Sequence, residues 1–201
     1  MHRGVLVAGR PDAFVIFSFA SAYANLSKAL VANGAWGADR TYGTDALAIQ
    51  NLPKIAGSDA TEGLRGTAPG TPQTSPAALA FDRLYASRRG PAAQTFAAQT
   101  FDAVILCYLS AIQAGKADGP VMANSVREVS APPGKIYAWP KLPAAIEEIE
   151  FAGDIDYQGA SGPIDMNSAG DATAGSYDLF RFRNGRLEVY DEVPVGRPTA
   201  G

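Results

Sequence analysis

Four residues in two short segments carry groups that could bind a small ligand. Phe19 offers an aromatic face, while Ala20 and Ser21 offer a hydroxyl and the free backbone N–H groups of a predicted helix start. Asp45 provides the only carboxylate of the two segments. An apolar face, N–H donors and one negative charge together suit a small molecule that has an ammonium group.

Each of these segments follows a predicted strand. Residues 12–19 form a nearly continuous apolar run, which is typical of a parallel strand covered on both faces, and residues 40–44 form a second strand. Helices over 21–33 and 46–56 follow and end at glycines, so the region predicts a βαβα alternation. If both strands are parallel neighbours, the segments lie side by side at the carboxyl edge of the sheet, where open sheets bind ligands.

Each candidate residue also has a purely structural interpretation. On local sequence alone, N-capping of the following helix is the more frequent role for an aspartate such as Asp45, and it does not exclude a ligand contact. Ser21 is likewise more often a cap, and Phe19 more often part of a core. Tyr42, within the second strand, could lie under a ligand or pack in the sheet. Tyr42 therefore joins the four residues above as a candidate ligand contact.

The composition restricts the class of partner. The chain has 201 residues, of which 47% are hydrophobic and 18% charged, and this predicts a globular protein with one core or two small ones. Its formal net charge is -3, so it has no basic field to hold a phosphate backbone. We expect no nucleic-acid partner.

No group of residues predicts catalysis, a metal site or a cofactor. The string over 159–163 resembles a nucleophile elbow, but Pro163 replaces its final glycine, and the only histidine, His2, is at the terminus. The single cysteine, Cys107, excludes an internal disulfide and is predicted to lie in the core. Residues 165–171 resemble a calcium loop, but Ala169 stands where an oxygen ligand is needed and Ser176 takes the place of the bidentate glutamate, so a turn explains them better.

The middle of the chain is predicted to be helical without intervening strands. A short strand over 62–68 leads into Pro69-Gly70-Thr71-Pro72, which breaks regular structure and predicts a crossing between two lobes. Helices are expected over 76–88, 94–114, 119–129 and 139–152, and short strands over 162–166, 176–183 and 186–190. Asn184-Gly185 predicts a tight hairpin between the last two strands.

Several strings, taken in order, resemble one family. They are Pro11-Asp12-Ala13 before a hydrophobic strand, Tyr42-Gly43-Thr44-Asp45, Gly63-Leu64-Arg65-Gly66-Thr67, Phe101-Asp102-Ala103-Val104, and Gly159-Ala160-Ser161-Gly162-Pro163-Ile164-Asp165 with Gly170-Asp171. Their order and spacing resemble the type I periplasmic solute-binding proteins of ABC transporters. The leucine/isoleucine/valine group, which binds branched-chain amino acids, is the most similar branch.

The resemblance implies an α/β fold with a parallel-sheet lobe of the periplasmic-binding-protein type I, together with helices from a second lobe and with the N-terminal half missing. Residues 1–72 and 159–201 would belong to the C-terminal lobe, and residues 73–158 largely to the N-terminal lobe. The helices over 94–129 would then expose an apolar face with no sheet of their own to cover it. We expect that face either to be covered by the missing half or to cause self-association.

The resemblance also implies a function. The chain would be the non-catalytic solute-binding component of an ABC transporter, which binds a branched-chain or similar small amino acid by hinge closure and docks on a membrane permease. Asp45 would be the family's acidic contact to the ligand's ammonium group, and the segment from Phe19 to Ser21 would contact the ligand from the same lobe. The family's contacts to the ligand carboxylate lie mainly in the other lobe, so this chain alone is expected to bind poorly.

Other interpretations stay open. The same fold could serve as a cytoplasmic ligand-sensing or regulatory domain, or the chain could be a non-functional fragment. The resemblance implies a periplasmic protein, whereas the first ten residues lack an export signal, which predicts a cytoplasmic location if the chain is translated as written. An α/β enzyme would need a base or a cofactor loop that the sequence does not offer.

Overall fold

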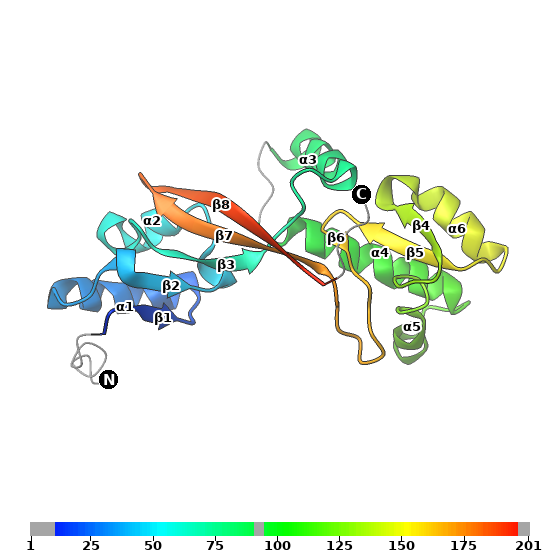
Figure 1. Cartoon of the computed structure of the whole chain (residues 1–201), viewed down its shortest axis with the longest axis horizontal. Helices are drawn as coiled ribbons and strands as arrows, with labels where there is room; N and C mark the ends of the chain where they lie inside the picture. Colours follow the sequence, from blue (N-terminus) through cyan, green and yellow to red (C-terminus); the bar gives the residue numbers. More distant parts are fainter. Residues whose placement is uncertain (1–10, 91–94, 197–201) are drawn as a thin grey trace. The chain divides into compact units, whose positions relative to one another are not determined.

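A computed structural model describes residues 11–90 and 95–196 (Figure 1). The described chain forms two compact units. The first contains residues up to Pro69 together with Tyr177–Val193, and the second contains Gly70–Ser176 and the residues from Pro194 on. Each unit has its own sheet and its own hydrophobic core.

The first unit contains a five-stranded sheet in the order β1-β2-β3-β7-β8. The strands β1, β2 and β3 are parallel, and β7 is antiparallel to β3. The predicted parallel neighbourhood of the first two strands is therefore confirmed. The elements are β1 (Phe14–Ile16), α1 (Ala20–Asn33), η1 (Ala38–Arg40), β2 (Thr41–Gly43), η2 (Asp45–Leu47), α2 (Leu52–Ala56), η3 (Ser58–Ala60), β3 (Arg65–Pro69), β7 (Gly175–Arg183) and β8 (Arg186–Val195).

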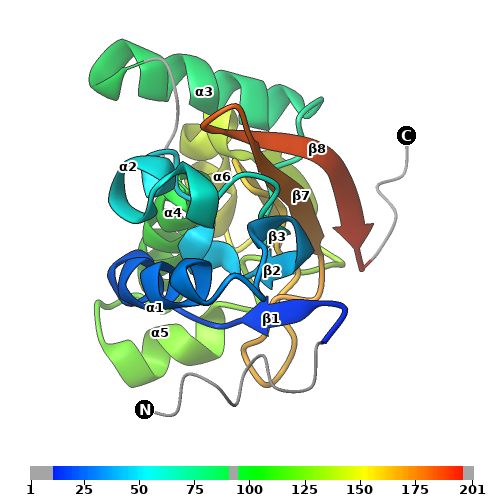
Figure 2. The same cartoon turned by 90° about the vertical axis from the view of Figure 1, so that its left-hand side faces the viewer.

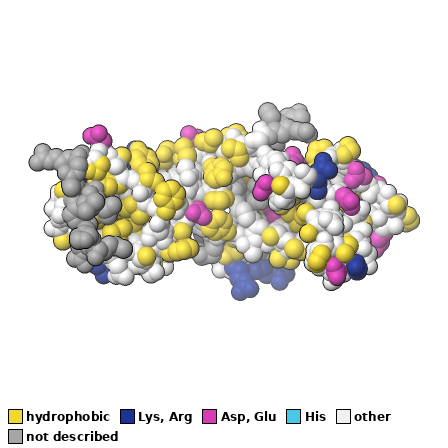
Figure 3. Space-filling model, turned by 90° about the horizontal axis from the view of Figure 1, so that it is seen from below, with side chains coloured by type: hydrophobic (Ala, Val, Ile, Leu, Met, Phe, Trp, Pro, Cys, Tyr) yellow, Lys and Arg dark blue, Asp and Glu magenta, His cyan; other side chains and the backbone are white. Residues whose placement is uncertain are grey.

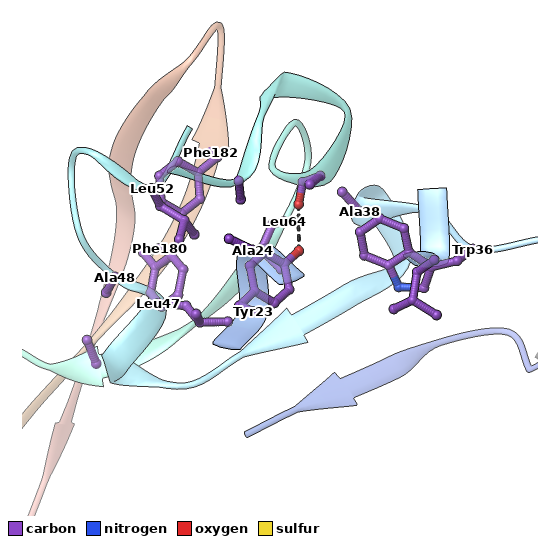
Figure 4. Packing of buried hydrophobic residues seen from close by; sticks show 14 residues of the cluster. Tyr23, Ala24, Trp36, Ala38, Leu47, Ala48, Leu52, Leu64, Phe180 and Phe182 are labelled. Carbon is purple, nitrogen blue, oxygen red and sulfur yellow. Dashed lines mark hydrogen bonds between the residues drawn. The ribbon is translucent and has the colours of Figure 1, made fainter. Parts of the chain in front are cut away.

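One face of this sheet is covered by helices. The helices α1 and α2 lie on the same side of the strands (Figure 2). Tyr23 of α1 and Leu52 of α2 pack in one core with Phe180 and Phe182 of β7 (Figure 4). The Tyr23 hydroxyl donates a hydrogen bond to the carbonyl oxygen of Ala60, and burial raises the pKa of Tyr23 above its ordinary value. Burial of these large side chains is the main stabilising contribution in this unit.

The second unit contains a three-stranded sheet in the order β4-β5-β6. The strands β4 and β5 are parallel, and β6 is antiparallel to β5. The elements are α3 (Pro76–Arg89), α4 (Ala97–Gln113), α5 (Gly119–Ser125), β4 (Lys135–Ala138), η4 (Trp139–Lys141), α6 (Leu142–Glu150), β5 (Ile155–Gly159) and β6 (Gly162–Pro163). Within the described residues, no helix is both long and apolar enough to cross a bilayer.

This sheet corrects one expectation from the sequence. The helices over 94–129 were expected to have no sheet of their own, but Leu106 and Leu109 of α4 pack with Tyr137, Ile155 and Tyr157 of β4 and β5. The two strands have only four and five residues, so each carries little sequence signal. The expected absence of a sheet is therefore wrong.

A different side of α4 is exposed and apolar. The side chains of Val104 and Tyr108 are 64% and 51% exposed, and Cys107 between them is exposed too. The prediction that Cys107 lies in the core is therefore wrong, because its position faces away from the stripe of Leu106 and Leu109. An exposed apolar helix face was expected here, and one is present, although a second face of the same helix is covered.

Two further elements differ from their predicted bounds. The helix expected over 46–56 is divided into η2 and α2, because Pro53 fits only in the first turn of a helix. Residues 159–176, which the resemblance assigned to the C-terminal lobe, belong to the second compact unit, where β6 pairs with β5 and Ile164 packs in the core. The assignment of the units to lobes stays a prediction.

Candidate functional site

The two candidate segments lie at the same edge of the first unit's sheet. Ile16 at the end of β1 is in register with Gly43 at the end of the parallel strand β2. The chain leaves both strands in the same direction, into residues 17–19 and 44–45. The carboxyl ends of parallel strands form the edge at which open α/β sheets bind ligands.

The first segment brings the uncapped start of α1 to this edge. Phe19 is the N-cap residue, with extended backbone angles (φ -84°, ψ 156°) and a side chain that is 76% exposed. Its side chain accepts no hydrogen bond from the helix, so the first backbone N–H groups of α1 lack a side-chain acceptor. Ala20 is half-buried against the core, and Ser21 is exposed within the first turn. The alternatives of a core role for Phe19 and a capping role for Ser21 are therefore wrong.

The second segment brings one carboxylate to the edge. Asp45 is half-buried and is the first residue of η2, whose N-cap is Thr44 and lacks a side-chain hydrogen bond. The capping role expected for Asp45 is thus absent. Among the described residues, no hydrogen-bond donor or cation pairs with its carboxylate, whereas its backbone oxygen accepts from the N–H of Ala48 at 2.9 Å. A half-exposed carboxylate in this state can accept hydrogen bonds from an ammonium group.

Tyr42 lies on the sheet face that α1 and α2 leave uncovered. Its side chain is 42% exposed and adjoins Val15, its register partner on β1. The guanidinium carbon of Arg65 lies 5.8 Å from the centre of the Tyr42 ring, within the range of a cation–π interaction. Tyr42 is thus held by Arg65 one residue before the end of β2.

Backbone contact between β2 and β3 fixes the edge. Gly43 and Gly66 are register partners, and a β-carbon on Gly66 would overlap the carbonyl oxygen of Gly43. A β-carbon on Gly43 would meet Leu47 of η2. Glycine at both positions therefore allows the close approach that places Asp45 beside the strand end. These contacts join two of the strings that carry the family resemblance.

A second pair of those strings meets in the second unit. The buried carboxylate of Asp102 accepts a hydrogen bond at 2.6 Å from the hydroxyl of Ser161 and another at 2.8 Å from the N–H of Ala160. Ser161, the serine of the string that resembles a nucleophile elbow, therefore lies in a turn and donates to the carboxylate of Asp102. Among the described residues, no group of three His, Cys, Asp or Glu side chains could hold a metal ion.

One exposed aromatic at the edge was not predicted. The side chain of Phe17, between β1 and Phe19, is 81% exposed, and that of Val15 is 65% exposed. The expectation of a strand covered on both faces is therefore wrong. An unbroken apolar run has no polar alternation, so the sequence carries no signal for which face stays open.

The sequence matches no family model and no curated protein, but it is similar to solved structures. A leucine-binding protein, LivK, from Thermotoga maritima is 22% identical with a TM-score of 0.70, over 95% of this chain and 47% of its own. The branched-chain amino acid transporter protein LivJ from Streptococcus pneumoniae, in complex with isoleucine, is 14% identical with a TM-score of 0.63, over 96% and 47%. An ABC transporter solute-binding protein from R. palustris, in complex with benzoate, is 16% identical with a TM-score of 0.57, over 98% and 48%.

These similarities show the fold. The chain has the α/β fold of the type I periplasmic binding proteins, and the predicted fold class is confirmed. It spans about half of the length of the structures that it matches, 47% and 48% of theirs. That coverage agrees with the expected correspondence to one half of the family fold, the C-terminal half.

Proposed function

We propose that the chain is part of the solute-binding component of an ABC transporter and that it contributes one wall of a site for a branched-chain or similar small amino acid. The observation that carries this proposal is the position of Asp45. Its carboxylate, which has no partner among the described residues, and the uncapped start of α1 follow adjacent parallel strands at one edge of the sheet. The fold shared with leucine- and isoleucine-binding proteins supports it.

The proposed binding mode follows from the groups at the edge. The ligand's ammonium group donates to Asp45, one oxygen of its carboxylate accepts from the first N–H groups of α1 and the hydroxyl of Ser21, and its apolar side chain contacts Phe19. Tyr42, beside Val15, supports the wall from the sheet. No residue in this arrangement needs to act as an acid, a base or a nucleophile, and we propose binding without catalysis.

Further groups must come from the rest of a complete protein. We propose that its other lobe provides the remaining contacts to the ligand's carboxylate, that closure of the hinge excludes water, and that the closed form docks on a membrane permease. Excluding water strengthens an ammonium–carboxylate pair because the local dielectric falls. A periplasmic location belongs to this proposal.

The test is binding of L-leucine, L-isoleucine and L-valine to a protein that contains both lobes. We expect Asp45→Ala to weaken binding at least about 100-fold in calorimetry, because it removes the charged partner of the ammonium group. Asp59→Ala, which removes an exposed carboxylate from the same unit, is the control and should bind as the parent does. Unchanged affinity of Asp45→Ala would contradict the role of Asp45.

Benzoate separates two classes of ligand. The R. palustris protein of this fold is in complex with benzoate, which has no ammonium group. If Asp45 selects for an ammonium group, benzoate should not bind, and its carboxylate should be repelled by Asp45. Tight benzoate binding with no amino-acid binding would replace the amino acid by an aromatic acid as the ligand.

A further inference from the structure

One face of the sheet in the first unit is not covered by any described helix. The helices α1 and α2 both lie on the opposite face (Figure 2). Exposure alternates along the strands: β2 exposes Tyr42 between two buried residues, and β3 exposes Arg65 and Thr67. We call the surface that these outward side chains form the open face.

A row of four register partners crosses the open face. Val15 of β1 lies beside Tyr42 of β2, and Tyr42 lies beside Arg65 of β3. Arg65 in turn lies beside Arg181 of β7. Hydrophobic side chains gather on the surface of this first unit, at the left of Figure 3. The row itself is apolar at β1, where the side chain of Val15 is 65% exposed, and basic at β3 and β7.

The two arginines of the row differ in their partners. The Nε atom of Arg181 lies 3.1 Å from Oε2 of Glu188. The guanidinium group of Arg65 lies over the ring of Tyr42, and within the described residues no carboxylate pairs with it. Like charges on directly opposite residues destabilise a sheet. A carboxylate placed over Arg65 from elsewhere would remove that cost.

The strand directions indicate what kind of element fits the open face. β1, β2 and β3 are parallel. Connections between parallel strands place helices on the faces of a sheet, and such sheets occur almost only with both faces covered. A helix is therefore the element that fits best. The chain spans only 47% of the leucine-binding protein LivK, so a complete protein of that size has residues for such a helix.

We propose that an amphipathic helix covers the open face, that it belongs to the part of a complete two-lobed protein outside this chain, and that it holds a carboxylate over Arg65. Its apolar side chains contact Val15 and the ring of Tyr42. A second copy of the chain is a poorer occupant, because it would bring its own Arg65 and Arg181 against the same two charges. The proposal shares the two-lobed protein with the proposed function, but it depends neither on Asp45 nor on the identity of the ligand.

Calorimetry of the full chain with two synthetic peptides tests the chemistry of the open face. Each peptide has about 20 residues, which is long enough for a helix in water, with leucine at every third or fourth position. One peptide carries glutamate and alanine at its other positions, and the second carries lysine and alanine. We expect the glutamate peptide to bind with a Kd below about 1 mM and at least about tenfold more tightly than the lysine peptide.

Two pairs of matched variants locate the contact. Arg65→Glu should weaken binding of the glutamate peptide at least about tenfold, because attraction becomes repulsion. Arg83→Glu, at an exposed position of α3, should change it less than about twofold. Val15→Asn should weaken binding at least about threefold by removing an apolar contact. Val104→Asn on α4 should not, although Val104 is 64% exposed against 65% for Val15.

Three results overturn the proposal: no binding of either peptide up to about 1 mM, equal binding of the two peptides, or equal effects within either pair of variants. Circular dichroism confirms that each variant is folded.

Phenylglyoxal, which modifies exposed arginines, tests the source of the helix. Arg65 and Arg83 should both react in this chain, whereas in a protein that contains both lobes Arg65 should react at least about tenfold more slowly, because a helix on the sheet covers it. Mass spectrometry measures both rates without an amino-acid ligand, so this result is separate from the test of Asp45→Ala. Equal reactivity of Arg65 in the two proteins overturns the assignment of the helix to the same protein.

Discussion

The carboxylate of Asp102 accepts both polar hydrogens of Ser161: the backbone N–H donates at 2.7 Å and the hydroxyl at 2.6 Å. The N–H of Ala160 and the hydroxyl of Tyr157 donate to the same carboxylate at 2.8 and 2.9 Å. Asp102 is only 2% exposed, so these donors replace the water that it loses on folding. The network joins the middle of α4 to the turn between β5 and β6.

Replacing Asp102 should destabilise the second unit strongly. Asp102→Ala leaves buried donors without an acceptor, so we expect a loss of about 3–5 kcal/mol in the free energy of unfolding. Ser161→Ala removes only one hydroxyl and should cost about 1 kcal/mol. Asp82→Ala, at an exposed position of α3, is the control and should change stability by less than about 0.5 kcal/mol. Equal stability of the two aspartate variants would show that the network contributes nothing.

The same turn requires a glycine. A β-carbon on Gly159 would overlap the carboxylate of Asp102, so Gly159→Ala should cost about 1–3 kcal/mol by overpacking. Gly175→Ala is the control, because a β-carbon there meets no atom within 4 Å. Urea denaturation measures both. A Gly159→Ala variant as stable as Gly175→Ala would mean that α4 can move away from the turn without cost.

Asp178 should make the first unit less stable as the pH rises. Burial, together with the nearby negative charge of Glu192, raises the pKa of Asp178 to about 6. A raised carboxyl pKa means that the folded state holds the proton more tightly than the unfolded chain. The stabilisation is therefore complete below about pH 4 and is lost as the pH rises to about 6 and above.

Asp178→Asn tests this dependence. Because the side chain is half-buried and solvent reduces the effect, we expect the variant to be more stable than the parent by about 1 kcal/mol above pH 7. The decrease in stability between about pH 4 and pH 6 should be smaller in the variant. Asp59→Asn removes the same charge from an exposed position of this unit and should keep the parent's decrease. If Asp178→Asn keeps it as well, another group is responsible.

The hydrogen bond of Tyr23 should stabilise the first unit measurably. Tyr23 is fully buried, and Tyr23→Phe leaves the carbonyl oxygen of Ala60 without this donor. We expect a loss of about 1–2 kcal/mol in the free energy of unfolding. Tyr108→Phe, at a position that is 51% exposed, should change it by less than about 0.5 kcal/mol.

The two tryptophans allow each unit to be followed alone. Trp36 packs in the core of the first unit, and Trp139 lies in the second, where its indole N–H donates to the carbonyl oxygen of Ala77 at 2.8 Å. In a Trp139→Phe background the fluorescence of Trp36 reports the first unit. In a Trp36→Phe background the fluorescence of Trp139 reports the second. A variant of one unit should shift only that unit's transition if the units unfold independently.

Local signals were sufficient for several elements. The helix α1 ends at Gly34, whose φ of 73° is the left-handed conformation that glycine adopts at a helix end. The hairpin between β7 and β8 turns at Asn184 and Gly185, with φ of 53° and 71°, as the Asn-Gly pair predicts. In both cases the required backbone conformation depends on one or two residues and needs no distant partner.

The strands of the second unit could not be identified in the same way. β4 and β5 have only four and five residues; Tyr137 has apolar neighbours on both sides, and the polar Asp156 of β5 is buried. Such segments become strands only by pairing with each other and packing against α4. The contact between Asp102 and Ser161 has the same origin, since 59 residues separate the two in the sequence.

At the candidate site, the sequence by itself determined the chemical groups and their order: an aromatic face, helix N–H groups and one carboxylate after two strands. Only the tertiary structure decided that these strands are parallel neighbours, that Asp45 is not a cap and has no ion-pair partner in the part of the chain that is described, and that Val15 and Phe17 are exposed. The periodicity of apolar residues along a sequence indicates which helices and strands can form. Burial and pairing depend on which other elements pack against them, and that information lies in residues far away along the chain.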